Sequence, residues 1–280
     1  MELEDLSIAS RALEARLTYV GPMTARPRYY AVNSAQNVIA RDRRKIRIED
    51  ARSRPQPPSL AEEGFALFPH QSAVADFHNP VELERIYAPE MERLITEVSG
   101  ADQVVVYGPV LLRSGQAAPE SSGFQILRPG HFVHTDMSDS IVAEFTQTRR
   151  PRNNARAVRR YAYYNTWRVL SPPPQDVPLA LCDARTVSRS DLVDADLIMD
   201  APGQPESSVV VSFVRHNTSH RWSYFSNLGQ DEVLVFKSHD SDPHQPHQVP
   251  HSAFRDSSCP PGVTPRTSIE ARLVAFWFAS

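Results

Sequence analysis

Beyond residue 100 the chain is a succession of short apolar or alternating segments with turn-rich stretches between them. Such segments are typical of β-strands, and the near absence of long helical patterns between them favours a sandwich or barrel over a doubly wound α/β sheet. We therefore predict a mainly β fold. The predicted strands cover residues 104–112, 161–170, 177–184, 208–216, 221–225, 231–237 and 268–278.

The first third of the chain has a different pattern. Residues 16–50 alternate between polar and apolar positions around a polar turn, which predicts a hairpin. We interpret residues 1–100 as an N-terminal α/β elaboration with flanking helices. It is expected to pack on a β core of residues 101–280 within a single integrated domain.

One helix is predicted with defined ends. Asn79 is a good N-cap, and Pro80 occupies the first helical position, where proline is favoured. Gly100 is well placed to end the helix, because glycine readily adopts the left-handed backbone of a C-terminal cap. Pro89 is expected to kink or split the segment, since proline cannot donate a backbone hydrogen bond.

Composition excludes several classes of protein. The net charge of −3 gives no basic field for nucleic acid, and no run of about 18 apolar residues is present to span a membrane. The acidic start lacks the apolar region of a secretory signal. Two cysteines, Cys182 and Cys259, cannot make a disulfide framework, which favours the cytoplasm. There is no phosphate loop and no glycine-rich dinucleotide fingerprint.

The first candidate ligands are His134 and Asp136. On a strand, residues two apart project from the same face, so this imidazole and carboxylate converge on one point. That arrangement makes one edge of a two-histidine, one-carboxylate triad, which suits non-haem iron. A His-x-Asp pair also occurs by chance in many proteins, so the pair alone does not identify a metal site.

A second histidine must come from a distant segment, and residues 244–251 offer His244, His247 and His251. His251 is preferred because it lies beside apolar residues that enter a strand, where packing can fix its ring. An exposed polar loop accounts for His244 and His247.

Downstream, an Arg-x-Ser pair on a predicted strand places Arg266 and Ser268 on one face. A guanidinium and a hydroxyl together match the two oxygens of a carboxylate, such as the distal carboxylate of 2-oxoglutarate. Arg272 lies further along the same face and is the rival. A salt bridge between Arg272 and Glu270 or another acid is its ordinary structural explanation.

Several longer segments resemble the hydroxylase/desaturase family of secondary metabolism, which includes gibberellin desaturase-like enzymes and cephamycin methoxylation components. The resemblance covers nearly the whole chain. It rests on EEGFALFPHQSAVADF (62–77), VHTD (133–136), YNTWRVLSPPPQDVPLALCDART (164–186), HRWSYFSNLGQDEVLVFKSHDS (220–241) and VPHSAFRDSSCPPGVTPRTSIEAR (249–272).

The resemblance implies a double-stranded β-helix (jelly-roll) core and an enzyme that uses Fe(II), 2-oxoglutarate and O2. By this resemblance the metal ligands are His134, Asp136 and His251, and Arg266 and Arg272 fall in the family's arginine-bearing C-terminal strand. The expected reaction is hydroxylation, desaturation or oxidative cyclisation of a small molecule.

Five further residues are assigned to the surroundings of the metal. Met137 departs from the glutamine of the family pattern and is predicted to shape the substrate pocket. Asn165 and Trp167 share a strand face and are predicted to line that pocket, although core packing explains Trp167 equally well. Arg168 would act from the strand's edge, and Tyr163 is a candidate contact of the co-substrate.

Two other functions remain open at this point. An iron oxidase that uses dioxygen without 2-oxoglutarate would keep the triad and use Arg266 for a substrate carboxylate. A non-catalytic jelly-roll protein would bind a small molecule without needing all three ligands. The expected partner is a small molecule, with homodimerisation possible. Lys237 is interpreted as the solvated end of a strand.

Overall fold

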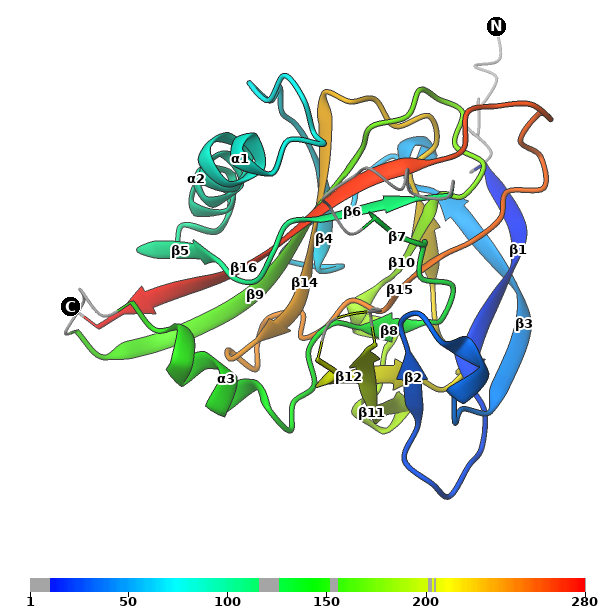
Figure 1. The fold of residues 1–280 in the computed structure, drawn as a ribbon, viewed down its shortest axis with the longest axis horizontal. Coiled ribbons are helices and arrows are strands. Elements are labelled where there is room, and N and C mark those ends of the chain that lie inside the picture. Colours follow the sequence, from blue (N-terminus) through cyan, green and yellow to red (C-terminus); the bar gives the residue numbers. More distant parts are fainter. Residues whose placement is uncertain (1–10, 116–125, 152–155, 201–202, 204, 280) are drawn as a thin grey trace, which may run out of the picture.

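The computed structural model describes residues 11–115, 126–151, 156–200, 203 and 205–279. Within these residues the chain forms two β-sheets that face each other (Figure 1). Residues 1–10, on which the prediction about a secretory signal depends, lie outside the described part. The prediction of a mainly β fold is confirmed.

The larger sheet has nine strands among the described residues, and the chain crosses it repeatedly, so neighbouring strands are often distant in sequence. In spatial order they are β1 (Ala12–Val20), β3 (Arg41–Asp50), β13 (Trp222–Tyr224), β10 (Leu179–Cys182), β15 (His251–Ala253), β8 (His134–Thr135), β12 (Ser207–Val214), β11 (Leu192–Met199) and β2 (Arg28–Tyr30).

The smaller sheet is built around two long antiparallel strands, β9 and β16, which pair over most of their length. Its strands in spatial order are β4 (Phe65–Pro69), β14 (Glu232–Asp240), β9 (Val158–Val169), β16 (Thr267–Phe278), β6 (Leu111–Ser114) and β7 (Ile126–Leu127), and β5 (Gln103–Val106) pairs with the far end of β16.

Alternation along β9 and β16 divides the smaller sheet into two faces. On the outer face, Tyr164 and Leu273 pack with apolar side chains of the helices. On the inner face, Trp167 packs with residues of the larger sheet such as Leu181. Since side chains alternate strictly along a strand, this division decides which residues can reach the space between the sheets.

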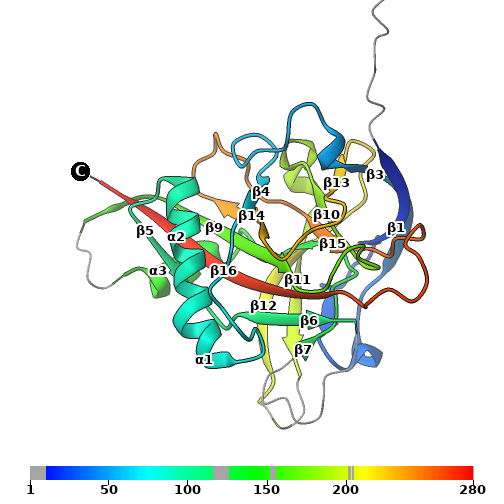
Figure 2. The same ribbon diagram turned by 90° about the horizontal axis from the view of Figure 1, so that it is seen from above.

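The predicted helix is present with the predicted ends. Asn79 accepts a hydrogen bond from the backbone of Val81, and Gly100 closes the helix with φ 65°. The helix is not uniform: α1 (Pro80–Glu82) passes through a π-helical turn (Leu83–Tyr87) into α2 (Ala88–Ser99). That wider turn lies just before Pro89, which cannot donate to the helical ladder. Figure 2 shows α2 lying across the outer face of β5 and β16.

The predicted hairpin is also present, because β1 and β3 pair antiparallel from Ala12 opposite Glu49 to Val20 opposite Arg41. Between them in sequence, β2 leaves the hairpin and pairs with β11 at the other edge of the sheet. The N-terminal third therefore supplies β1, β2 and β3 to the larger sheet and β4 to the smaller one.

Several elements were not predicted, α3 (Val142–Arg149) and β11 among them. Helix α3 has no clear apolar periodicity. Its Val142 and Phe145 pack against the inner face of the smaller sheet. In β11 the aspartates Asp194 and Asp196 interrupt the apolar run, so the strand is inconspicuous in the sequence. Among the described residues, no helix has the length and apolarity to span a membrane.

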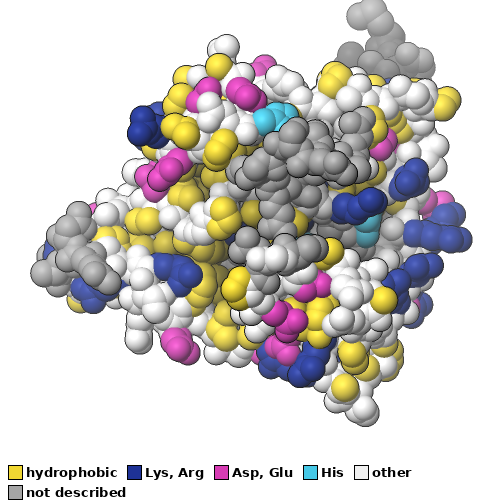
Figure 3. All heavy atoms as spheres, viewed as in Figure 1, with side chains coloured by type: hydrophobic (Ala, Val, Ile, Leu, Met, Phe, Trp, Pro, Cys, Tyr) yellow, Lys and Arg dark blue, Asp and Glu magenta, His cyan; other side chains and the backbone are white. Residues whose placement is uncertain are grey.

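Basic side chains gather on the right of the face in Figure 3, where β1 and β3 lie in Figure 1. Exposed cationic residues of β3 include Arg43 and Lys45. Lys45 pairs with Glu14 on β1, so part of this charge is compensated locally. The overall net charge of −3 therefore conceals a local basic strip.

Lys237 is not the solvated strand end that its sequence position suggested. β14 continues to Asp240, and the side chains of Lys237 and Asp240 are 2% and 0% exposed. Lys237 Nζ lies 2.9 Å from Asp240 Oδ2, and Arg160 donates to the same carboxylate. A buried carboxylate between two cations offsets the cost of burying Lys237.

The Asp240→Asn variant should therefore lose stability. We expect its free energy of unfolding to fall by about 3–5 kcal/mol, because a buried ammonium is left without its counter-charge. Urea denaturation measures the loss. The matched control is Glu14→Gln, which breaks the exposed pair with Lys45 and should change little. Equal losses in the two variants would contradict this account.

Candidate metal centre

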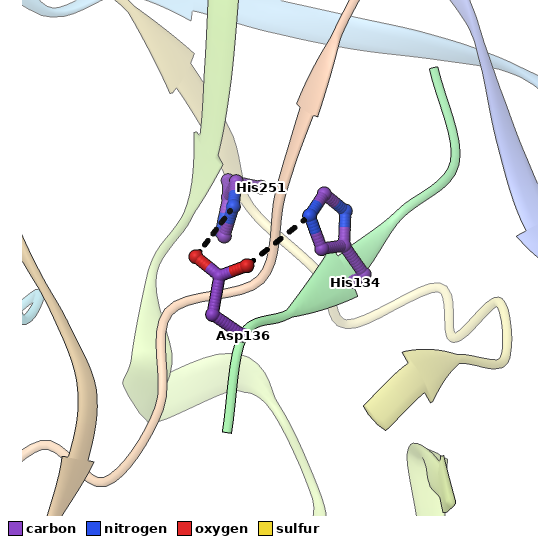
Figure 4. Close-up of side chains that lie close together, drawn as sticks. All are labelled: His134, Asp136 and His251. Carbon is purple, nitrogen blue, oxygen red and sulfur yellow. Dashed lines mark ion pairs between the residues drawn. The ribbon is translucent and has the colours of Figure 1, made fainter. Parts of the chain in front are cut away.

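Two histidines meet across adjacent strands of the larger sheet. His134 in β8 and His251 in β15 are direct antiparallel partners, so their rings project from the same face with centroids 4.3 Å apart. Asp136 follows two residues after His134 and points to the same side (Figure 4). Its Oδ1 lies 3.7 Å from His134 Nε2, and its Oδ2 lies 3.7 Å from His251 Nε2. The structure thus brings the three predicted ligands together.

Backbone carbonyls orient both rings. His134 Nδ1 lies 2.7 Å from the carbonyl oxygen of Phe132, and His251 Nδ1 lies 3.2 Å from that of Val249. Each Nδ1–H donates there, which leaves the Nε2 lone pair directed at the centre. Burial, and then the nearby His251, lower the pKa of His134 to about 4, so this ring is neutral at pH 7. Neutral imidazoles with free Nε2 atoms are what a divalent metal requires.

The carboxylate of Asp136 is held by donors from the smaller sheet. Asn165 donates to Oδ2, and Arg272 donates to Oδ1 at 3.2 Å. Burial works against the charge, but Arg272 and the two histidines keep the pKa of Asp136 well below its usual range. Asn165 in β9 and Arg272 in β16 are themselves direct cross-strand partners. The ligands therefore come from one sheet and the groups that hold Asp136 from the other.

Replacing Asn165 by leucine should weaken metal binding without removing a ligand. Loss of a hydrogen bond to a ligating carboxylate typically costs about 10–100-fold in metal affinity. Titration with Co2+ under anaerobic conditions measures the change. Thr166→Val is the control, because Thr166 lies on the other face of the same strand, where its hydroxyl donates to the backbone of Ala271. An unchanged affinity in Asn165→Leu would exclude this role.

Beside the histidines, a narrow cavity runs between the sheets towards Arg266. It is lined by Arg113, Gly130, His134, Trp167, Leu179, Phe236, His251, Ala253, Arg266 and Glu270. Arg266 is 1% exposed, and its guanidinium lies 5.3 Å from the centre of the Trp167 ring. Burial, and then Arg113, lower the pKa of Arg266, which reflects a cation in a place that disfavours charge.

Arg266 and its neighbour Ser268 each have one buried polar atom without a hydrogen-bond partner among the described residues. Arg266 donates through Nη1 to the carbonyl oxygen of Val177 at 2.9 Å, but its Nε has no hydrogen-bond partner within the described structure. The hydroxyl of Ser268 is also buried and unpartnered there. Buried polar atoms are rarely left unpaired in folded proteins, so these two atoms distinguish this end of β16 from the rest of the core.

A second cavity shares Arg113, Gly130 and His134 with the first. It is mostly apolar, and it reaches the centre through His134, Asp136 and Arg272. Its other lining residues are Tyr29, Ala31, Leu111, Arg113, Leu127, Arg128, Pro129, Gly130, Phe132, Leu197, Met199, Val211 and Phe213. We call it the outer chamber, and we call the cavity that leads to Arg266 the inner chamber. A mostly apolar chamber beside a polar centre suits a small organic molecule.

Arg272 is committed to two carboxylates and is not free for a ligand. It pairs with Glu270 at 3.0 Å as well as with Asp136, so the ordinary salt bridge considered for it is present. Glu270 also faces Arg113 at 3.4 Å. Sequence reasoning missed both Glu270 and Arg113 as site residues. The sequence could have identified Glu270, because it lies between Ser268 and Arg272 on the same strand face. The sequence could not have identified Arg113, because its place in the site depends on the pairing of β6 with β16, two strands that are distant in the chain.

Three predicted site residues lie elsewhere. Tyr163 and Met137 pack together under α3, where the Tyr163 hydroxyl is 2.9 Å from Thr146 Oγ1. Neither lines either chamber. Arg168 projects from the outer face of β9 and donates to the carbonyl oxygens of His70 and Gln230. Strand alternation explains why Arg168 points outward: Asn165 and Trp167 are on the inner face, so the next residue, Arg168, is on the outer one.

Comparisons with known proteins agree with this arrangement. Residues 17–276 match the family described as the oxidoreductase/YMDC permease-like domain. A hydroxylase/desaturase, efuI of Hormonema carpetanum, is 30% identical over 247 residues, which is 82% of each chain. The Fe(II)/2-oxoglutarate-dependent dioxygenase nvfI of Aspergillus novofumigatus is 28% identical over 244 residues, 83% of each chain. The hydroxylase/desaturase CTB9 of Cercospora beticola is 29% identical over 251 residues, covering 84% of this chain and 76% of the relative.

A solved structure shares the fold. The iron and alpha-ketoglutarate-dependent endoperoxidase NvfI superimposes with a TM-score of 0.80 at 23% sequence identity. The superposition covers 97% of this chain and all of the other. At this level of identity the likeness establishes the arrangement of the strands.

Proposed function

This chain belongs to the oxidoreductase/YMDC permease-like domain family, alongside fungal hydroxylase/desaturases and Fe(II)/2-oxoglutarate-dependent dioxygenases, and we propose that it is itself such a dioxygenase acting on a small molecule. One observation carries the proposal. A largely buried centre of His134, Asp136 and His251 borders two chambers, and the inner chamber reaches Arg266, which has an unpartnered Nε among the described residues and lies two residues before the unpartnered hydroxyl of Ser268.

In this proposal His134, Asp136 and His251 hold Fe(II). Their donor set, two imidazoles and one carboxylate, is the set that leaves positions open on non-haem iron. Arg272 and Asn165 keep Asp136 ionised and fix both of its oxygens. A zinc hydrolase is disfavoured, because the chain has no His-Glu-x-x-His motif and no paired cysteines.

Arg266 and Ser268 are proposed to bind the distal carboxylate of 2-oxoglutarate. A guanidinium supplies charge-assisted hydrogen bonds to a carboxylate, and the hydroxyl adds a third donor on the same face. The anion would relieve the cost of burying Arg266 and satisfy both unpaired atoms. Trp167, stacked near the guanidinium, forms a wall of this inner chamber. Arg272 is excluded from the role by its pairs with Asp136 and Glu270.

Bound iron and 2-oxoglutarate supply an oxidant that removes hydrogen from a substrate carbon, with O2 consumed and succinate and carbon dioxide formed. The protein's part is to hold the substrate in the outer chamber with one carbon beside the centre, and to exclude water with apolar walls. Hydroxylation, desaturation and oxidative cyclisation differ in where that carbon and its neighbours lie.

The proposal includes a fold assignment and a location. The two facing sheets, with the ligands on short inner strands, support a double-stranded β-helix (jelly-roll) core. Cys182 and Cys259 are both free thiols, and Cys182 is buried. Free thiols persist in a reducing compartment, which supports the cytoplasm.

The test is anaerobic reconstitution of the purified protein with Fe(II) and 2-oxoglutarate. We expect a weak visible charge-transfer band that requires both reagents and is absent from the His134→Ala variant. Stoichiometric iron without the band would favour an oxidase that takes its electrons from the substrate alone. Absence of stoichiometric iron would leave a small-molecule binding protein as the better description.

A further inference from the structure

A second group of metal-binding side chains lies outside the candidate centre. It consists of Asp139, three residues after Asp136, His239 in β14, and His247 in the loop that leads to β15. The ligand atoms of Asp139, His239 and His247 all lie within 4.8 Å of one another. None of the three lines the inner or the outer chamber.

These side chains converge on one atom. Asp139 Oδ1 lies 2.6 Å from His247 Nε2 and 3.2 Å from His239 Nδ1, and the two rings are 4.7 Å apart. Gln248 donates to the same oxygen at 3.0 Å. The other oxygen, Oδ2, faces only the exposed Arg189, at 3.5 Å, among the ion pairs of the described chain.

The hydrogen-bond pattern of His247 leaves a position for a cation. Its Nδ1 lies 3.2 Å from the carbonyl oxygen of Asp240, which can only accept a hydrogen bond, so Nδ1–H donates there. Nε2 then presents a lone pair to a carboxylate oxygen at 2.6 Å, and two lone pairs repel at that distance. Either a second proton or a metal ion must lie between them. His239 is 5% exposed, and burial lowers its pKa, so its ring is neutral and can offer a nitrogen lone pair to a metal ion.

We propose that Asp139, His239 and His247 form a second metal site, selective for a divalent ion of the zinc type. Two imidazoles and one carboxylate are ligands that zinc prefers, with water completing a tetrahedron. At metal–ligand distances of about 2.0–2.2 Å, two ligand atoms of a tetrahedral site lie roughly 3.3 Å apart. The His239–Asp139 pair is already at 3.2 Å, whereas the His247–Asp139 pair, at 2.6 Å, has to open.

The second site is connected to the first through Gln248. Its Nε2 donates to Asp139, and its Oε1 accepts from the hydroxyl of Thr135 at 2.9 Å. Thr135 stands between the candidate ligands His134 and Asp136. An ion at the second site therefore clamps together the segment after Asp136, the end of β14 and the segment before His251. This inference does not depend on the oxygenase proposal, because it uses none of the same ligands.

Zinc binding by the full-length chain tests the site. Metal-stripped protein is dialysed against Zn2+, and the bound metal is measured by mass spectrometry. We expect two equivalents for the wild type, one for His134→Ala, one for His247→Asn and none for the double variant. His244→Asn is the matched control: His244 is an exposed histidine of the same loop, outside the group, and this variant should keep two equivalents.

Asp139→Asn provides a second variant on an exposed position, where folding is not in question, and it should also keep one equivalent. With Co2+, the His134→Ala protein should show the visible bands of a tetrahedral site, and these bands should vanish in the double variant. Two equivalents retained by His247→Asn and Asp139→Asn, or no zinc on His134→Ala, would overturn the proposal. Both results leave the oxygenase assignment standing, since that assignment is lost only with the His134 site.

Discussion

The Asp136→Ala variant is expected to retain no stoichiometric iron and to lose at least about three orders of magnitude in turnover, because metal-derived stabilisation of several kcal/mol is removed. Asp136 is the only carboxylate of the triad, and its two oxygens each lie 3.7 Å from an Nε2 atom, one of His134 and one of His251. Turnover is measurable without knowing the substrate, as slow succinate release from 2-oxoglutarate under air. Iron is measured in the same sample.

Alanine at position 136 leaves Arg272 paired with Glu270 alone, so some loss of stability accompanies the loss of iron. Circular dichroism separates the two effects. Asp231→Asn is the control, since Asp231 is an exposed carboxylate just before β14 and far from the ligands. A variant that is folded and keeps both iron and succinate release would remove Asp136 from the metal site.

The second large effect is expected at Arg266. In Arg266→Leu the Michaelis constant for 2-oxoglutarate should rise roughly 100-fold, because the buried partner of the distal carboxylate is lost. The same variant should lose its preference for 2-oxoglutarate over 2-oxobutanoate, which has no distal carboxylate. The affinity for iron should stay the same, because Arg266 does not hold any of the three proposed metal ligands in place.

Arg266→Lys is the informative companion to this variant. Lysine keeps the charge but not the planar guanidinium, so the Michaelis constant of this variant for 2-oxoglutarate should lie between those of the wild type and Arg266→Leu. Selectivity unchanged in Arg266→Leu would show that the carboxylate binds elsewhere. Arg113 would then be the next candidate, because it lines both chambers.

Much of the fold could be predicted because its signals are local. The ends of the helix depend on Asn79 and Gly100, and the hairpin depends on alternation within β1 and β3. The triad was readable for the same reason. His134 and Asp136 are two residues apart in a segment expected to be extended, and His251 stands among apolar neighbours.

What could not be predicted depends on which strands become neighbours. Whether Arg272 binds a ligand or an acid is decided by the approach of Asp136 from the other sheet. The burial of Lys237 depends on β14 continuing to Asp240, which the polar residues after Lys237 conceal. His247 was dismissed as an exposed loop residue because its partner Asp139 is distant in sequence.

The outer chamber draws many of its walls from strands that carry neither histidine of the proposed centre. The two histidines of the proposed centre lie on β8 and β15 in the middle of the larger sheet, whereas much of the outer chamber comes from β2 and β11 at its edge and from β6 and β7 in the smaller sheet. With the substrate in the outer chamber, as proposed, substitutions on these peripheral strands would change which molecule is accepted without disturbing the proposed metal ligands. Natural selection can therefore vary the chemistry of a pathway at its margins, and a gene duplicate can acquire a new product while its catalytic step is inherited intact.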